Sequence, residues 1–445
     1  MNSKTNFYIF EAEMGDQDQN HPLERILVSP GLFWIGEYIM NDLLVEDKWF
    51  VSCELVCKTW RNFFVQSELW KKRLLKYIAP EGSHRRFVLQ KHLKEFEDPV
   101  ESHAYYRKVA FSFSRKAIEK SWENEQFTIK RIISFPIVRD IQVMNGSQVI
   151  VAENNTVTIA NRNEFIVENP ILNVAKFTIN SVLKGHRREV TCLDFDPISK
   201  IVISGGRDRN LITWETSSGT RLNTQNEAHA RLITKVKIHK NSVFSSSRDR
   251  SIKIWDLFNL TLVQALIGDH AHSVWCIDIS QRYLVSASAD DSLGVWHQND
   301  QETWNLKHKL NNEEPVRNVI ILKKSPDLAV SGDLLGDLKV WNIHEGQFKY
   351  QVPHPSDSGL FRQGGVIVSL TQTEDLVGVA FSIQSVALFS TRNCQTALEP
   401  LKLLELDTYL EKTAFIRTIT LTEDGQLYVC NVSGQNGIVL FDIWQ

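Results

Sequence analysis

The 445-residue sequence contains no run of roughly 18 apolar residues, the length that a membrane-spanning helix requires. Its N-terminal segment has no basic stretch followed by an apolar core, so we expect no secretory signal there. The formal net charge of −3 gives no excess of basic charge, and we expect neither a nucleic-acid nor a membrane partner. The six cysteines are scattered, as is typical of reduced thiols, which predicts a cytoplasmic and/or nuclear protein.

The short motifs of common catalytic sites are also missing. The sequence has no phosphate-binding G-x-x-x-x-G-K-[ST], no nucleophile motif G-x-S-x-G and no zinc-binding H-E-x-x-H. Cys53 and Cys57 lie four residues apart on an expected helix, where two small core residues and a metal site are the alternatives. A zinc site needs about four ligands, and no companion pair lies nearby, which favours the core. We therefore expect no metal, no other cofactor and no enzymatic activity.

Regions of different character follow one another along the chain. We expect residues 1–23 to form a disordered tail. Residues 24–78 and 79–124 carry apolar residues at three- and four-residue steps, which predicts helices. Residues 125–445 alternate short β-rich runs with Gly, Asn, Asp and Ser turns. The predicted fold class is α+β and multidomain, with an all-β region after two helical segments.

A run of apolar residues that ends in an aromatic residue recurs through the β-rich region. The spacings between successive aromatic residues are 41, 41, 45, 48 and 52 residues, and these residues are Trp214, Trp255, Trp296, Trp341, Phe389 and Phe441. A weaker copy around Ile159 makes seven units. This period and this Trp are typical of WD repeats, which predicts a seven-bladed β-propeller. Because the last unit ends at its third strand, we expect residues 125–133 to supply its fourth, closing strand.

His186, Asp208 and Trp214 occur in one unit and allow two interpretations. They could belong to a catalytic site, or they could form a hydrogen-bonded network that holds the blade together. Their place in the repeat favours the structural network. The aspartate of the turn recurs in the next two units, whereas Leu335 replaces it in the fifth.

The segment "SPGLFWIGEYIMNDLLVEDKWFVSCELVCKTWRNFFVQSELWKKRLL" resembles an F-box, in Pro30 with Gly31 and Leu32, in "LVCKTWR" and in the closing "LWKK". The order F-box, helical linker and seven WD repeats resembles the beta-transducin repeat-containing protein (Slimb-like) family. The segment "AYYRKVAFSFSRKAIEKSW" is similar to that family's linker. The resemblance implies a non-catalytic substrate receptor of an SCF-type cullin-RING ubiquitin ligase. The alternative is a WD-repeat interaction scaffold with a vestigial F-box and no ligase role.

In this family the F-box binds a Skp-type adaptor, which connects it to the cullin and the RING subunit. The resemblance assigns the adaptor-binding role to apolar positions of the F-box-like segment. Any one of these residues could instead only hold the helices of the segment together. The residues are Pro30, Leu32, Ile35, Ile39, Leu43, Leu55, Val56, Trp60 and Trp70.

Relatives of this architecture bind phosphorylated degrons through arginines at two repeat-phased places, the start of the inner strand and the turn after the second strand. Arginine suits this role because its guanidinium group pairs bidentately with phosphate. The alternative is that turn arginines are solvated or serve nearby carboxylates. The residues at these places, including one aromatic anchor, are Arg139, Arg207, Arg248, Trp275, Arg317 and Arg417.

Glu153 departs from this pattern. The close relatives have arginine before an Asp-Asn-Thr turn, whereas Glu153 precedes "NNT" here. A carboxylate at that point would repel phosphate. We therefore expect either a different degron or the loss of a requirement for phosphorylation.

Overall fold

The computed structural model describes residues 128–132, 135, 137–144, 148–169, 174–352, 365–382, 385–406, 415–422, 426–431 and 437–442. The F-box-like segment, the helical linker and the predicted adaptor-binding residues lie outside these ranges, so these expectations stay predictions. In the described ranges, no helix has the length and apolar content to span a membrane.

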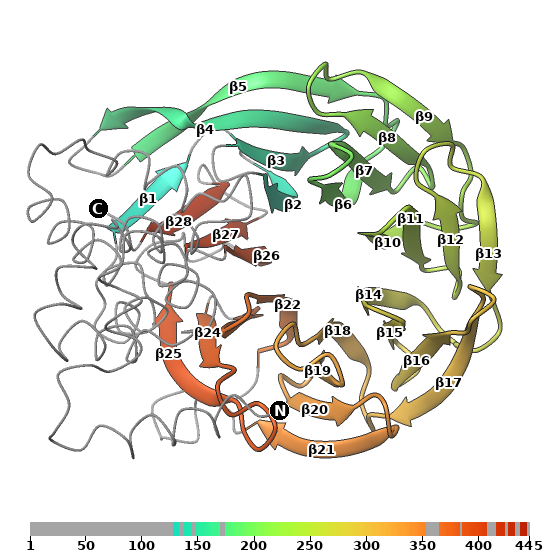
Figure 1. The fold of residues 1–445 in the computed structure, drawn as a ribbon. Helices are drawn as coiled ribbons and strands as arrows, with labels where there is room; N and C mark the ends of the chain where they lie inside the picture. The colour runs from blue at the N-terminus through green and yellow to red at the C-terminus, as the bar shows by residue number, and fades with distance from the viewer. Residues whose placement is uncertain are drawn as a thin grey trace, which may run out of the picture. The chain divides into compact units, whose positions relative to one another are not determined.

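In the described residues, 28 strands form seven four-stranded blades arranged in a ring around a common axis (Figure 1). Blades one to three are β2 (Val138–Val143), β3 (Gln148–Glu153), β4 (Thr156–Asn169) and β5 (Val174–Lys184); β6 (Val190–Asp196), β7 (Ile201–Gly206), β8 (Leu211–Glu215) and β9 (Arg221–Gln225); and β10 (Ile233–His239), β11 (Ser242–Ser247), β12 (Ile252–Asp256) and β13 (Leu262–Leu266). Blades four and five are β14 (Val274–Ser280), β15 (Tyr283–Ser288), β16 (Ser292–Gln298) and β17 (Trp304–Asn311); and β18 (Val316–Ile321), β19 (Leu328–Asp333), β20 (Leu338–Asn342) and β21 (Gln347–Val352). Blades six and seven are β22 (Ile367–Gln372), β23 (Leu376–Phe381), β24 (Ser385–Ser390) and β25 (Glu399–Glu405); and β26 (Ile416–Leu421), β27 (Leu427–Asn431), β28 (Ile438–Asp442) and β1 (Thr128–Ile132). The predicted seven-bladed all-β propeller is confirmed.

The apolar core lies between blades. The middle strands are apolar and β-branched, and strands such as β7 and β23 are buried along their whole length because a neighbouring blade covers each face. Seven hydrophobic clusters each combine side chains from two adjacent blades. The recurring aromatic residues of the third strands are part of this core. The outer strands β9 and β13 are largely exposed.

Strand β1 closes the ring. It pairs antiparallel with β28, from Thr128 opposite Asp442 to Ile132 opposite Ile438, so the segment predicted to supply the fourth strand of the last unit does so. Strand β1 also pairs in parallel with β5, at Val174 and Ala175, and no pattern in the sequence indicated this second contact. The 14-residue β4 and the 11-residue β5 extend beyond the usual strand length and reach the seam. Blades one and seven therefore share one eight-stranded sheet.

Blades two, three and four each contain a copy of the same hydrogen-bonded network. In blade three, Trp255 Nε1 donates to Ser245 Oγ at 2.8 Å, Ser245 Oγ lies 2.8 Å from His229 Nε2, and His229 Nδ1 lies 2.9 Å from Asp249. The same four roles recur around His186 and around His270. These contacts support the structural interpretation of His186, Asp208 and Trp214.

In blade five the network changes its members. Leu335 occupies the turn position as predicted, and the carboxylate of Asp333 instead accepts a hydrogen bond from Asn312 Nδ2 at 3.4 Å. Trp341 Nε1 still donates to Ser331 Oγ at 2.8 Å. Asparagine and aspartate here replace the histidine and the turn aspartate of the earlier blades.

The serine is present only where the tryptophan is present. The strand pairing aligns Ser245 with Val379 in blade six, Val429 in blade seven and Ala152 in blade one. In those blades phenylalanine or isoleucine replaces tryptophan, so no indole N–H needs an acceptor. The indole donor and its serine acceptor are lost together, because a half-satisfied polar pair in the core is destabilising.

The network predicts a pH dependence of folding. Burial lowers the pKa of His229, even though Asp249 acts in the opposite direction. Below the ordinary histidine pKa of about 6.5, the unfolded chain therefore binds a proton that the folded chain does not. The free energy of unfolding then decreases as the pH is lowered. We expect the contribution of His229 to be complete above pH ~6.5 and to decrease by on the order of 1 kcal/mol toward pH ~5.

Urea unfolding at a series of pH values measures this effect. The variant His229→Asn, which carries the residue that blade five uses, should be less stable at neutral pH and should lose less stability on acidification. The exposed His272 provides the control, and His272→Asn should keep the wild-type slope. Equal slopes for His229→Asn and the wild type would contradict the assignment.

Candidate functional site

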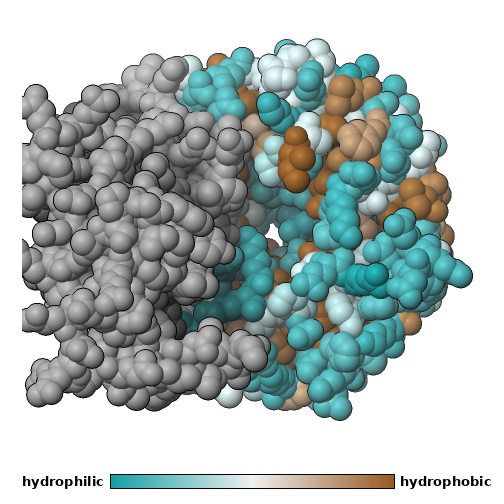
Figure 2. Space-filling view, in the orientation of Figure 1, coloured by the Kyte–Doolittle hydropathy of each residue, from teal (hydrophilic) through white to brown (hydrophobic). Residues whose placement is uncertain are grey.

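A β-bulge interrupts the start of the inner strand in every blade. One residue is skipped in the pairing of each inner strand with the second strand, and a bulge of this kind turns the skipped side chain away from the regular alternation. All seven skipped residues line one cavity of about 760 Å³ in the central channel: Arg139, Thr191, Thr234, Trp275, Arg317, Val368 and Arg417. Figure 2 shows the opening at the centre of the blades, with hydrophilic residues around most of it.

The two turn arginines lie at the same end of the channel. The backbone N–H of Arg207, just after β7, donates to the carbonyl oxygen of Glu189 at 2.8 Å. The N–H of Arg248, just after β11, donates to the carbonyl oxygen of Leu232 at 3.2 Å. Glu189 and Leu232 each precede the first residue of an inner strand, so these bonds fix both turns against the ends of the strands that carry the bulges.

Glu189 joins two of the arginines. Arg139 Nη2 donates to Glu189 Oε1 at 3.0 Å, and Arg207 Nη1 donates to Glu189 Oε2 at 3.2 Å. Burial on its own would raise the pKa of Glu189, but the two arginines outweigh it and lower that pKa. The carboxylate is therefore ionised at neutral pH. We call these two arginines, Arg139 and Arg207, together with the Glu189 that joins them, the closed pair.

The other three arginines form no ion pair of this kind in the part of the chain that the structure describes. The guanidinium of Arg317 lies 5.2 Å from the ring centre of Trp275, a cation–π contact. Burial and then Arg248 lower the pKa of Arg317, and burial and then Arg317 and Arg139 lower the pKa of Arg417, which indicates mutual repulsion. Among the residues that the structure describes, no carboxylate forms an ion pair with Arg248, Arg317 or Arg417. We call these three residues the open arginine cluster.

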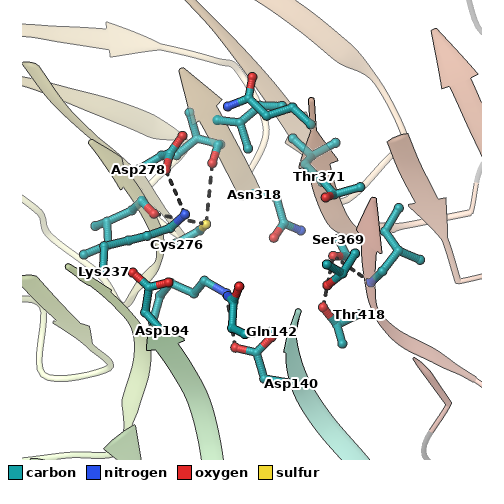
Figure 3. A pocket seen from close by; sticks show the side chains of 18 of the residues that line it. Asp140, Gln142, Asp194, Lys237, Cys276, Asp278, Asn318, Ser369, Thr371 and Thr418 are labelled. Carbon is teal, nitrogen blue, oxygen red and sulfur yellow. Dashed lines mark hydrogen bonds and ion pairs between the residues drawn. The ribbon is translucent and has the colours of Figure 1, made fainter. Parts of the chain in front are cut away.

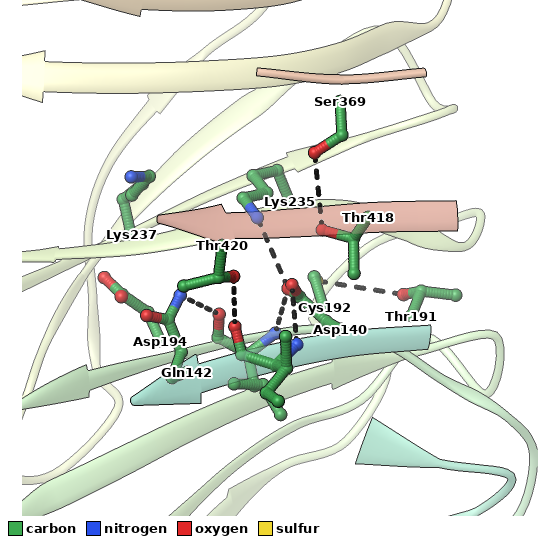
Figure 4. Close-up of polar contacts among 12 residues, drawn as sticks. Asp140, Gln142, Thr191, Cys192, Asp194, Lys235, Lys237, Ser369, Thr418 and Thr420 are labelled. Atoms are coloured by element: carbon green, nitrogen blue, oxygen red, sulfur yellow. Dashed lines mark hydrogen bonds and ion pairs between the residues drawn. The ribbon is translucent and has the colours of Figure 1, made fainter. Parts of the chain in front are cut away.

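Charges deeper in the channel are balanced. Lys237 Nζ lies 3.0 Å from Asp278, and the two point toward one another in Figure 3. Lys235 Nζ lies 3.3 Å from Asp140, and a dashed line marks this ion pair in Figure 4. The carboxylate of Asp140 also accepts the backbone N–H of Leu193 at 3.0 Å, from the next blade. An anion would therefore be attracted to the end of the channel that carries the arginines.

The thiols near the channel are unsuited to nucleophilic chemistry. Burial raises the pKa of Cys192 to about 12, and it raises the pKa of Cys276 as well. Both remain neutral thiols at physiological pH, whereas the thiolate is the reactive form. The arrangement favours binding of an anionic group over covalent catalysis.

The comparisons with known proteins agree with this architecture. The family model "WD domain, G-beta repeat" matches residues 177–215, 219–256 and 261–297. This chain contains WD40 repeats. The matched segments include the third strands of blades two, three and four, which hold the complete Trp-Ser-His-Asp network. A WD40 propeller of this kind is a platform for protein–protein interaction.

Two solved structures show the same fold. "Structure of U3-55K" has 18% identity and a TM-score of 0.55, and the match covers 69% of this chain and 95% of that one. "Crystal structure of RRP9 WD40 repeats" has 18% identity and a TM-score of 0.54, covering 71% of this chain and 99% of that one. At this identity the likeness concerns the fold alone. No curated protein matches the sequence.

The structure brings the predicted degron-binding residues together at one end of the channel. Arg139, Trp275, Arg317 and Arg417 are bulge residues, and Arg248 lines the same cavity. Arg207 lies outside the cavity lining and reaches the group through Glu189. Their role in binding a degron stays a prediction.

The carboxylate that lies among the arginines is Glu189, which was not predicted from the sequence. The carboxylate that was predicted there, Glu153, does not occupy the turn position, as the pairing of the inner and second strands shows. Glu153 pairs with Val138 as Gly206 pairs with Val190, so Asn154 is the equivalent of Arg207. Burial is the cause that raises the pKa of Glu153. Glu189 could have been recognised from its position in the sequence, directly before the inner strand "VTCLDF".

The electrostatics predict opposite stability effects for two arginines. Replacing Arg417 with methionine removes a half-buried charge without an ion-pair partner in the described residues, and should raise the free energy of unfolding by on the order of 1 kcal/mol at low salt. The gain should shrink as salt screens the repulsion. Replacing Arg139 with methionine removes a partner of Glu189 and should lower the stability.

Urea unfolding of both variants at low and high salt provides the measurement. Arg139→Met is the matched control, since it removes the same charge at the equivalent bulge of the adjacent blade. A change of the same sign and size in both variants would refute the division into a closed pair and an open cluster.

Proposed function

We propose that the protein is a substrate-recognition subunit of an SCF-type cullin-RING ubiquitin ligase. In this proposal the F-box-like segment binds a Skp-type adaptor, and the arginine-bearing end of the channel binds a phosphorylated degron. The protein would perform no chemistry of its own and would position its substrate for ubiquitin transfer.

The open arginine cluster is the observation that carries the substrate side of the proposal. Partly buried charges without counterions destabilise a folded chain, so Arg317 and Arg417, with the exposed Arg248 at the same cavity, favour an anionic ligand. A phosphoserine carries nearly two negative charges and three acceptor oxygens. Arg248, Arg317 and Arg417 together offer the charge and the donors that such a group needs.

Phosphate fits this cluster better than a carboxylate does. One carboxylate already accepts a hydrogen bond from each of the two guanidinium groups of the closed pair, as Glu189 demonstrates. Three mutually repelling arginines call for a group with more charge and more acceptor atoms. Trp275 and Val368 add apolar surface beside them for the neighbouring residues of a peptide.

The adaptor side of the proposal rests on the resemblance of the F-box-like segment. The alternative is a propeller that serves as an interaction scaffold without a ligase role. The likeness to U3-55K and RRP9 does not decide between them, because it extends to the fold only. Adaptor binding separates the two functions directly.

The adaptor test uses the full-length protein purified together with a Skp-type adaptor. We expect a stable complex with the wild type and a loss of at least about tenfold in affinity for Trp60→Ala, since interface tryptophans often dominate binding energy. Trp275→Ala makes the same change in the propeller and should keep the adaptor. Absence of a wild-type complex would favour the scaffold, and undiminished binding by both Trp60→Ala and Pro30→Ala would contradict the assigned interface.

The substrate test measures binding of the full-length protein to a library of matched phosphorylated and unphosphorylated serine peptides. We expect preference for phosphorylated members, and a loss on the order of 100-fold when Arg317 and Arg417 are both changed to alanine. The control is Arg221→Ala, which removes an exposed arginine from the outer strand β9. Equal binding of both peptide classes by the wild type would rule out a phosphate-reading face.

A further inference from the structure

Glu189 occupies a repeat-phased position that is acidic in one blade alone. The residue before the first inner-strand residue is Ile137, Glu189, Leu232, Ser273, Pro315, Val366 and Phe415 in blades one to seven. Six of these side chains are uncharged. The carboxylate is therefore a feature of the junction between blades one and two, and not of the repeat.

The backbone around Glu189 is held from both sides. The N–H of Val190 donates to the carbonyl oxygen of Asn154 in blade one at 2.7 Å. The carbonyl oxygen of Glu189 accepts the N–H of Arg207 at 2.8 Å. The side chain thus begins at a fixed point, and its two oxygens are each taken by a guanidinium group from a different blade.

This geometry is the one in which two arginines hold an oxyanion. Arg139 and Arg207 converge on a single anionic group, and that group belongs to the chain itself. The closed pair carries one net positive charge, whereas the open arginine cluster carries three. A phosphate at the closed pair would have to displace Glu189 and would still lie next to its charge.

We propose that Glu189 acts as a built-in ligand that blocks one of two phosphate subsites, so that the face accepts a peptide with a single phosphate at Arg248, Arg317 and Arg417. The inference rests on the proposed phosphopeptide-binding function and specifies its substrate class. A second phosphate on the peptide contributes nothing to affinity while Glu189 is ionised. Neutral glutamine at this position frees the two arginines for a second phosphate.

The test compares the full-length wild type with Glu189→Gln. The probes are serine peptides with no phosphate, one phosphoserine, or two phosphoserines two to five residues apart. We expect the wild type to bind singly and doubly phosphorylated peptides within about threefold of each other. We expect Glu189→Gln to prefer one of the doubly phosphorylated spacings by at least about tenfold, with a steeper salt dependence.

Two further variants control for charge and for folding. Glu227→Gln neutralises another carboxylate that is ion-paired with an arginine, at 2.6 Å from Arg209, but does not line the cavity, and it should keep the wild-type ratio. Glu189→Asp keeps the charge and should also keep the wild-type ratio of affinities for singly and doubly phosphorylated peptides. Thermal unfolding of each variant confirms that the propeller is intact.

The outcomes separate the inference from the function on which it rests. A wild type that prefers two phosphates by tenfold, or a Glu189→Gln variant with an unchanged ratio, overturns the inference and leaves phosphopeptide binding in place. Failure of both proteins to bind any phosphopeptide overturns the proposed function and the inference together.

Discussion

Closure of the ring by β1 and β28 is the contact on which the rest of the propeller depends. The two strands come from opposite ends of the described chain, and their pairing makes blade one the neighbour of blade seven. Thr420 Oγ1 donates to the carbonyl oxygen of Ile141 at 3.1 Å across the same seam. Only a closed ring brings Arg139 of β2 within electrostatic reach of Arg417 of β26. The arginine-bearing face is therefore a product of closure and belongs to no single blade.

Two kinds of polar group occur inside this ring, and they obey different rules. The Trp-Ser-His-Asp network is complete in blades two to four and changes two members in blade five, and apolar residues replace both its serine and its tryptophan in blades six and seven. A half-satisfied polar pair in the core would be destabilising. The deeper channel follows the same rule, because Lys235 and Lys237 each meet a carboxylate. The open arginine cluster departs from it. Local departures of this kind are expected where binding, and not folding, has selected the residues.

Much of this fold could be predicted from the sequence, because the period of the third-strand aromatics reports a packing requirement that recurs in every blade. The arginines at the inner strands and turns could be located for the same reason. Glu189 could not, because its contacts with Arg139 and Arg207 depend on a bulge, on a backbone hydrogen bond between blades one and two, and on a second one within blade two. The long β4 and β5 hairpin was missed because its extra length serves the seam and has no counterpart in the other repeats.

The same bulge that exposes an arginine to the channel also decides what that arginine can meet. Arg139 lies beside a blade junction that carries a carboxylate, so an ion pair with Glu189 of the same chain neutralises its charge. Arg317 and Arg417 lie at junctions whose equivalent residues are uncharged, and they repel each other instead. Asp140, Lys235, Lys237 and Asp278 form ion pairs with one another below, and Asp140 and Glu189 attract Arg417 less strongly than Arg317 and Arg139 repel it. One equivalent position, occupied by glutamate in blade two and by uncharged residues elsewhere, thus separates arginines with a carboxylate partner from arginines that form no ion pair in the described residues.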